Sequence, residues 1–274
     1  KFKNHSISDV LDLTVEQASF QAEDNRMEIR ALQAQWAETR LRGNLQGNLT
    51  AKGPVVLQFQ LQADKVDMDR WSELLDTSPA AEGKGGSSVS GTFDSGWWKR
   101  LRIENGSLAI AEAKSKKIEA SDIRILAGMQ DRILTIGKLD CRLYGGTHQG
   151  TLRLDFHHQK PLFTYQGKVQ EMDVGPFLAD STLYRDLLQG KVQAALRVNG
   201  EVNPSGFINP STRGDGSFIL KDGRITSVSL ARQIQLVTRL TGWNITTSST
   251  QVDEAEGTFE QEGAVLILKK TQIR

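Results

Sequence analysis

Gly43-Asn-Leu-Gln-Gly47 and, a few residues later, Phe59-Gln-Leu-Gln-Ala-Asp-Lys-Val-Asp-Met-Asp69 form a block that occurs twice in this chain. The second copy is Gly146-Thr-His-Gln-Gly150 followed by Phe163-Thr-Tyr-Gln-Gly-Lys-Val-Gln-Glu-Met-Asp173. The glycines recur 103 positions apart (146 minus 43) and the later residues 104 apart (163 minus 59), which predicts one loop residue as the only length change. A block that recurs at such an interval is typical of one supersecondary unit stacked against a copy of itself.

Apolar and polar residues alternate through most of the chain, as where Leu57, Phe59 and Leu61 are separated by glutamines. Successive strand side chains point to opposite faces, so this alternation predicts strands with one apolar and one polar face. The same pattern occurs near residues 11–16, 28–36, 101–112, 120–127, 132–143, 152–156, 191–198, 216–221 and 264–270. The predicted fold is mainly β: a long curved antiparallel sheet built from repeated β-modules, with about three short helices. The apolar side is either closed as a β-sandwich or open as a groove.

Pairs of turn residues separate the predicted strands, and we expect them to supply the positive φ of tight hairpin turns. These pairs are Asn105-Gly106, Gly145-Gly146, Asn199-Gly200 and Asp222-Gly223.

Three segments are expected to be helical. Helices are predicted at 69–76 and 173–178, each begun by an aspartate that caps free amides, and the second can continue to a stop at Gly190. The third, at 229–241, has apolar residues at helical spacing.

The repeats divide the chain into two predicted parts. Residues 1–90 form a first, divergent repeat that ends in a flexible loop at 77–90, which contains Pro79 and is rich in Gly and Ser. Residues 91–274 form a second repeat plus the start of a third, with a C-terminal helix at 229–241.

The composition excludes some functions. Lys and Arg number 34 against 33 Asp and Glu, and aromatic residues are not interleaved with basic ones, so nucleic acid is not an expected partner. The single Cys141 can form no internal disulfide.

No apolar run approaches the roughly 18 residues of a membrane span. The basic residues at 99–102 beside Trp97 and Trp98 fit either a membrane or partner contact or a solvated strand end.

No set of residues in the sequence has the spacing that catalysis needs. His157 and His158 are adjacent and would face opposite sides of a strand, so they cannot share a metal ion. His148 is expected in a glycine-flanked turn, where the first copy has Leu45. We therefore expect no catalytic, metal-binding or cofactor-binding residues, no cofactor and no enzymatic activity.

The order of these motifs resembles the C-terminal module of the AsmA family of bacterial envelope proteins, which are related to the TamB-like bridge lipid-transfer proteins. The resemblance covers residues 101–274 well and the first hundred residues less well, because Arg42-Gly43-Asn44 stands where a Tyr-Gly-Gly turn is expected. The segments that carry it are Leu143-Tyr-Gly-Gly-Thr-His-Gln-Gly150, Val169-Gln-Glu-Met-Asp-Val-Gly-Pro-Phe-Leu178, Leu188-Gln-Gly190 and Gly214-Asp-Gly-Ser-Phe-Ile-Leu-Lys-Asp-Gly-Arg-Ile225.

The resemblance implies a periplasmic piece of a protein anchored in the inner membrane through parts outside this chain. It also implies an apolar groove along which phospholipid moves between the inner and outer membranes. The alternative is a non-catalytic β-repeat scaffold or protein-binding module of the cell envelope, whose protein partners are unknown. The candidate groove residues are Leu57, Phe59, Leu61, Leu152, Leu154, Phe163, Tyr165, Leu196 and Val198.

Overall fold

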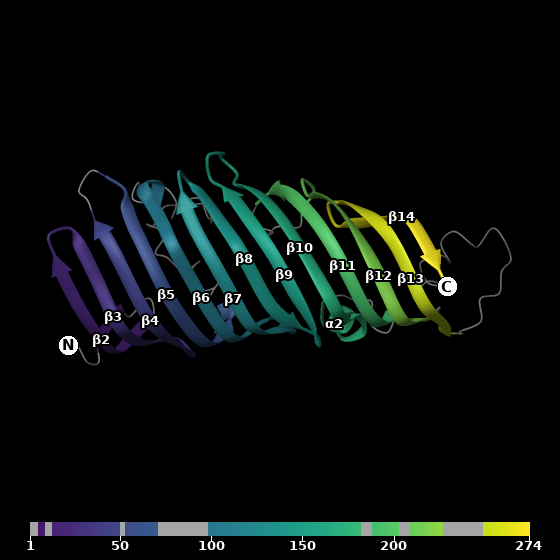
Figure 1. Ribbon diagram of the computed structural model, residues 1–274, viewed down its shortest axis with the longest axis horizontal. Coiled ribbons are helices and arrows are strands. Elements are labelled where there is room, and N and C mark those ends of the chain that lie inside the picture. The colour runs from purple at the N-terminus through teal and green to yellow at the C-terminus, as the bar shows by residue number, and fades with distance from the viewer. Residues whose placement is uncertain are drawn as a thin grey trace, which may run out of the picture.

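A computed structural model describes residues 5–8, 13–49, 53–70, 98–181, 188–202, 209–226 and 249–274 of the chain. These residues form one 14-stranded sheet in which every strand lies beside its neighbour in the sequence (Figure 1). The prediction of a mainly β protein built on one long sheet is confirmed. The sheet also runs without a break across the predicted boundary at residue 90, because β5 pairs with β6.

The strands and helices have the following bounds. The strands are β1 (His5–Ser8), β2 (Leu13–Glu23), β3 (Arg26–Trp36), β4 (Thr39–Leu49), β5 (Val55–Asp67), β6 (Leu101–Ser115), β7 (Ile118–Gln130), β8 (Ile133–Leu143), β9 (Gly146–Asp155), β10 (Leu162–Asp173), β11 (Leu188–Glu201), β12 (Arg213–Thr226), β13 (Ser249–Glu262) and β14 (Val265–Ile273). The helices are the 3-10 turn η2 (Trp98–Arg100) and α2 (Val174–Ser181), and residues 68–70 are also helical.

One pair of strands departs from the predicted antiparallel order. β5 and β6 run parallel, whereas every other neighbouring pair is antiparallel. A parallel pair needs a connection that returns to the starting end of the sheet, and residues 68–100 make that connection. The two repeats therefore differ in the strand that follows the hairpin. In the first repeat β5 is followed by the parallel strand β6, whereas in the second β10 is followed by the antiparallel strand β11.

The two copies of the repeated block form hairpins with different registers. In the first hairpin Gly47 lies opposite Leu57, but in the second Gly150 lies opposite Gly167. If the two hairpins had the same register, one extra loop residue would place Gly150 opposite Pro161, six positions before Gly167. The two copies are therefore similar in sequence but differ in strand register. A slip by an even number of residues leaves each side chain on its original face, so the alternation in the sequence cannot detect it.

Most of the predicted turn pairs lie inside strands. Asn105 (φ 55°) lies within β6 and Asp222 (φ 50°) within β12, while only the pair at Gly145 forms a hairpin turn. Positive φ at Asn105 accompanies a break in register with β7, which identifies a β-bulge. Asn199-Gly200 lies inside β11. The prediction of turns was therefore wrong at three of the four pairs. At Asn105 and Asp222 it was wrong because a bulge and a turn both use a positive φ.

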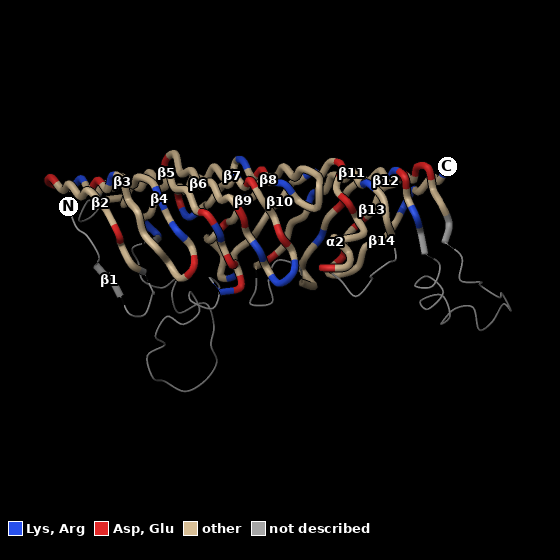
Figure 2. The backbone as a smooth tube through the Cα atoms, turned by 90° about the horizontal axis from the view of Figure 1, so that it is seen from below, with Lys and Arg blue, Asp and Glu red and all other residues tan. Residues whose placement is uncertain are grey.

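Bulges also bend the sheet. Asp122 in β7 and Glu171 in β10 have φ of 52° and 56° at breaks in register, and both lie close to one row of strand ends. We call this row, at which β3 joins β4, β6 joins β7, β8 joins β9 and β10 joins α2, the α2 rim. The strand ends at the α2 rim bend to one side of the sheet, and α2 lies on that side (Figure 2). A bulge bends its strand and increases the local twist, which accounts for the bend.

The buried core lies on that same side. Val174 of α2 packs with Leu220, Val252 and Ala255, which are 3 to 5% exposed. A second cluster joins Ala63, Val66, Ile110 and Ile123.

The helix predictions have mixed outcomes. α2 begins directly after Asp173, as expected, but it ends at Ser181, and the expected stop Gly190 lies inside β11. The extension of this helix was therefore wrong. The predicted helix at 229–241, the loop at 77–90 and residues 71–76 lie outside the described residues.

Candidate lipid-binding face

One face of the sheet carries an unbroken row of apolar residues and glycines that crosses the strands. Each member lies directly opposite the next in the strand register. The row, which we call the central row, consists of Leu32, Gly43, Leu61, Leu108, Ile125, Leu139, Gly150, Gly167, Leu196, Gly216, Phe259 and Leu268. It runs from β3 to β14. Directly opposed residues share a face, so the row forms part of one continuous surface, the apolar face.

Two further rows flank the central row on its side away from the α2 rim. The nearer one contains Phe59, Leu152, Tyr165 and Val198, and the farther one contains Leu57, Leu154 and Phe163. With Leu61 and Leu196 of the central row, these are the nine predicted groove residues. The structure places all nine on the apolar face. Phe163 and Val198 are buried, at 4% and 8% exposed, and the other seven are half-buried.

Aromatic rings on the apolar face lie against glycines. A β-carbon on Gly106 would come within 2.7 Å of Cζ of Phe59, and one on Gly216 within 2.8 Å of Cε1 of Phe259. The same arrangement holds for Phe163 against Gly200, Tyr165 against Gly167 and Phe218 against Gly257. Because glycine has no side chain, each ring can lie down along the sheet. The rings thus line the floor of the bent sheet.

Within the described residues, the apolar face is uncovered over much of its length. Among the described elements no second sheet packs on it, and α2 packs mainly against β11 to β13 and also reaches β7. On β14, Leu266 and Leu268 are 62% and 61% exposed. The described part of the chain therefore forms a bent sheet whose apolar face is only partly covered.

His148, Tyr165 and Cys141 form a small polar site on this face. Nε2 of His148 lies 3.0 Å from the hydroxyl of Tyr165, and Cys141 lies directly opposite His148. Burial lowers the pKa of His148, raises the pKa of Cys141, and raises the pKa of Tyr165 to about 12. All three shifts favour the uncharged form at neutral pH. The expectation that His148 lies in a turn was wrong, because it lies within β9.

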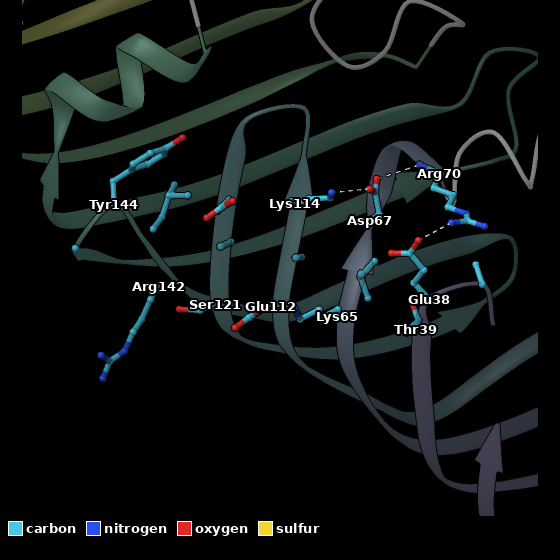
Figure 3. A pocket seen from close by; sticks show the side chains of 17 residues that line it. Glu38, Thr39, Lys65, Asp67, Arg70, Glu112, Lys114, Ser121, Arg142 and Tyr144 are labelled. Carbon is cyan, nitrogen blue, oxygen red and sulfur yellow. Dashed lines mark hydrogen bonds and ion pairs between the residues drawn. The ribbon is translucent and has the colours of Figure 1, made fainter. Parts of the chain in front are cut away.

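A cavity of about 600 Å³ opens from the apolar face at the α2 rim (Figure 3). Its floor is the row Val66, Ala113, Ala120 and Leu143, each directly opposite the next, and Val66 is 2% exposed. We call this cavity the rim pocket. Because its floor adjoins the cluster of Ala63, Ile110 and Ile123, the pocket is continuous with the apolar face.

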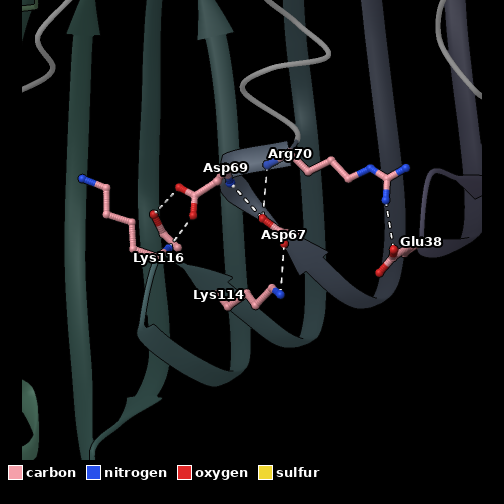
Figure 4. Close-up of polar contacts among 7 residues, drawn as sticks. Glu38, Asp67, Asp69, Arg70, Lys114 and Lys116 are labelled. Carbon is pink, nitrogen blue, oxygen red and sulfur yellow. Dashed lines mark hydrogen bonds and ion pairs between the residues drawn. The ribbon is translucent and has the colours of Figure 1, made fainter. Parts of the chain in front are cut away.

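Charged side chains surround the rim pocket. They are Glu38, Lys65, Asp67, Arg70, Glu112, Lys114, Glu119 and Arg142. Arg70 Nη1 lies 2.9 Å from Oε1 of Glu38, and Lys114 Nζ lies 3.1 Å from Oδ2 of Asp67 (Figure 4). Hydrogen bonds from Arg70 and Lys114 lower the pKa of Asp67, and Asp67 raises the pKa of Lys114. Both groups are therefore ionised across the neutral range.

Two aspartates fix the wall of the rim pocket. Oδ1 of Asp67 accepts hydrogen bonds from the backbone amides of Asp69 and Arg70, at 3.1 Å each, so Asp67 caps the helical turn. Asp69 was predicted to be the cap, which is wrong. Its carboxylate instead accepts hydrogen bonds from the hydroxyl of Ser115 and the amide of Lys116 in the β6–β7 turn.

Tyr144 links the rim pocket to α2. Its hydroxyl donates to Oδ2 of Asp180 at 3.1 Å, and its ring meets that of Phe177 edge to face, with centroids 5.8 Å apart. Burial and the neighbouring Asp180 raise the pKa of Tyr144 to about 12. α2 therefore borders the pocket on one side.

Sequence reasoning found the apolar face but missed the rim pocket. The pocket's wall comes from strands that are far apart in the sequence, and the sequence contains no motif that unites them. Within the described ranges, no cluster of His, Cys, Asp and Glu is placed to hold a metal ion. In that same part of the chain, no helix has both the length and the apolar character to cross a bilayer.

Comparisons with protein-family models, with curated proteins and with solved structures find no match to this chain.

Proposed function

We propose that this chain is the periplasmic part of an inner-membrane-anchored, AsmA-like protein. In this proposal the apolar face is a conduit that shelters the acyl chains of phospholipids as they pass between the inner and outer membranes. The chain would thereby support the integrity of the outer membrane. The proposal combines the family resemblance of the sequence with the geometry of the apolar face.

The observation that carries the proposal is the continuity of the central row across twelve strands, from Leu32 in β3 to Leu268 in β14. At roughly 4.8 Å per strand, eleven steps between strands span about 50 Å. An acyl chain of about 16 carbons gains on the order of 13 kcal/mol from apolar surroundings, at about 0.8 kcal/mol per methylene. An acyl chain can move along a surface at low cost only if it keeps this free-energy gain at every position along its path. A polar interruption in the central row would remove the gain at that position.

The glycine–aromatic contacts also favour a groove over a filled core. In a sandwich, large side chains from two sheets interdigitate between the layers. Here the rings of Phe59 and Phe259 lie against Gly106 and Gly216. This arrangement leaves room above the floor for a ligand. The surroundings of His148 and Tyr165 keep the groove uncharged, as an acyl chain requires.

Neither alternative has comparable support. A scaffold has no need of an apolar row that continues across strands on an open face. An enzyme needs a general acid or base with a pKa near neutrality. At the rim pocket, where charged groups gather, the pKa of Asp67 is lowered and that of Lys114 is raised, so both shift away from neutrality.

The test is lipid capture. The chain is produced in bacteria, purified without detergent and analysed by native mass spectrometry, then mixed with phospholipid vesicles and analysed again. We expect co-purified phospholipid, or uptake from the vesicles. A chain that is lipid-free after purification and takes up none from vesicles would refute the proposal and favour the scaffold.

A further inference from the structure

We propose that the rim pocket binds the headgroup of a zwitterionic phospholipid of the phosphoethanolamine class while its acyl chains lie on the apolar face. This inference rests on the proposed function, since it assigns a headgroup to the lipid that the groove shelters.

The shape of the rim pocket suits an amphiphile. Its volume of about 600 Å³ falls within the range of about 300 to 1,000 Å³ that is usual for small-molecule sites. Its floor, from Val66 to Leu143, is apolar and joins the apolar face, whereas its wall is charged. A lipid that entered here could place its acyl chains on the floor and leave its headgroup at the wall.

The charged side chains around the rim pocket favour a headgroup that carries both a positive and a negative charge. Around Lys114 lie the carboxylates of Asp67, Glu38 and Glu119, each of which raises its pKa, while Arg70 pairs with Glu38. The whole lining holds four acids and four bases, so the pocket has no net charge and suits a headgroup that itself carries one charge of each sign. A phosphoethanolamine group places its phosphate near Lys114 and Arg70 and its ammonium group near Glu38 and Glu119.

The existing ion pairs do not block this exchange. The side chains of Arg70 and Lys114 are 43% and 57% exposed, and that of Glu38 is 82% exposed. Ion pairs between exposed side chains contribute little stability, so a ligand that offers equivalent partners can replace them at low cost. Asp67 keeps its backbone hydrogen bonds during such an exchange, which preserves the pocket wall.

The experiment measures headgroup preference. The chain is incubated with vesicles of equal parts phosphatidylethanolamine and phosphatidylglycerol, reisolated, and its bound lipid is identified by mass spectrometry. We expect enrichment of phosphatidylethanolamine. In the double variant Glu38→Gln, Glu119→Gln this enrichment should fall roughly five-fold, because two weak ionic contacts to the ammonium group are lost.

The control is the variant Glu16→Gln, Glu23→Gln, which changes the net charge equally at exposed positions of β2. It should keep the wild-type preference. Uptake of both lipids in vesicle proportions, or a preference that survives the Glu38, Glu119 change, would overturn the headgroup site and leave the conduit intact. A chain that takes up neither lipid would overturn both proposals. Glycerophosphoethanolamine, which lacks acyl chains, should not compete at equal concentration, and competition would overturn the assignment to a lipid.

Discussion

The ring of Tyr165 lies over Gly167, two residues along the same strand, so that a β-carbon on Gly167 would come within 2.6 Å of Cζ of Tyr165. Gly150, directly opposite Gly167 in β9, leaves room for the other side of the ring, because a β-carbon on Gly150 would come within 3.1 Å of Cε2 of Tyr165. The hydroxyl thereby reaches Nε2 of His148. Two glycines thus determine how an aromatic side chain lies on the apolar face.

Gly167→Ala should displace the Tyr165 ring and break its hydrogen bond to His148. Overpacking of this kind typically costs about 1 to 3 kcal/mol of unfolding free energy, which chemical denaturation can measure. Gly137→Ala is the matched control, because a β-carbon there meets nothing within 4 Å. That variant should be neutral or slightly more stable. Equal stability of the two variants would contradict the role of Gly167.

Stability should decrease on acidification because of His148. Burial holds its pKa below the ordinary value of 6.5, so the unfolded chain binds a proton that the folded chain resists. The free energy of unfolding should therefore fall as the pH drops from about 6.5 through the lowered folded-state pKa. Nearby Asp140 opposes this shift, while Tyr165 and Cys141 stay uncharged in that range.

Thermal unfolding between pH 7 and pH 5 checks this prediction. The variant His148→Gln should lose that part of the pH dependence, whereas His158→Gln, at an exposed loop position, should keep it. An unchanged pH profile in His148→Gln would show that other groups cause the effect.

Leu196→Glu should block lipid uptake and leave the fold largely intact. Leu196 lies in the central row between Gly167 and Gly216 and is half-buried, so the carboxylate of a glutamate at this position can reach water. Ala195→Glu adds the same charge one residue away on the polar face, where the side chain is exposed. This control should take up lipid normally. If Leu196→Glu unfolded the chain, the site would be a dry core, since an unpaired buried charge is strongly destabilising.

Leu220→Ala should be among the most destabilising changes on the apolar face. Leu220 is 3% exposed beneath α2, beside Val174 and Val252. Removing a buried leucine side chain costs about 2 to 5 kcal/mol. Leu266→Ala, at a residue 62% exposed, should change stability by less than about 0.5 kcal/mol. Similar melting temperatures for the two variants would contradict the division of the face into a part covered by α2 and an open part.

The amino-acid sequence by itself determined which face each residue occupies. Alternation has a period of two, and a strand also repeats every two residues, so the nine predicted groove residues were assigned correctly to one face. The same alternation was sufficient to predict a β protein.

Only the tertiary structure decided how the strands align and where the sheet bends. Alternation is unchanged when two strands slip by an even number of residues, so it could not show that Gly150 lies opposite Gly167. Positive φ suits a turn and a bulge equally, so Asn105 and Asp222 were assigned to turns instead of strands. The rim pocket depends on both features. Its residues come together only after the registers and the bulges have placed the ends of β5 to β8 side by side.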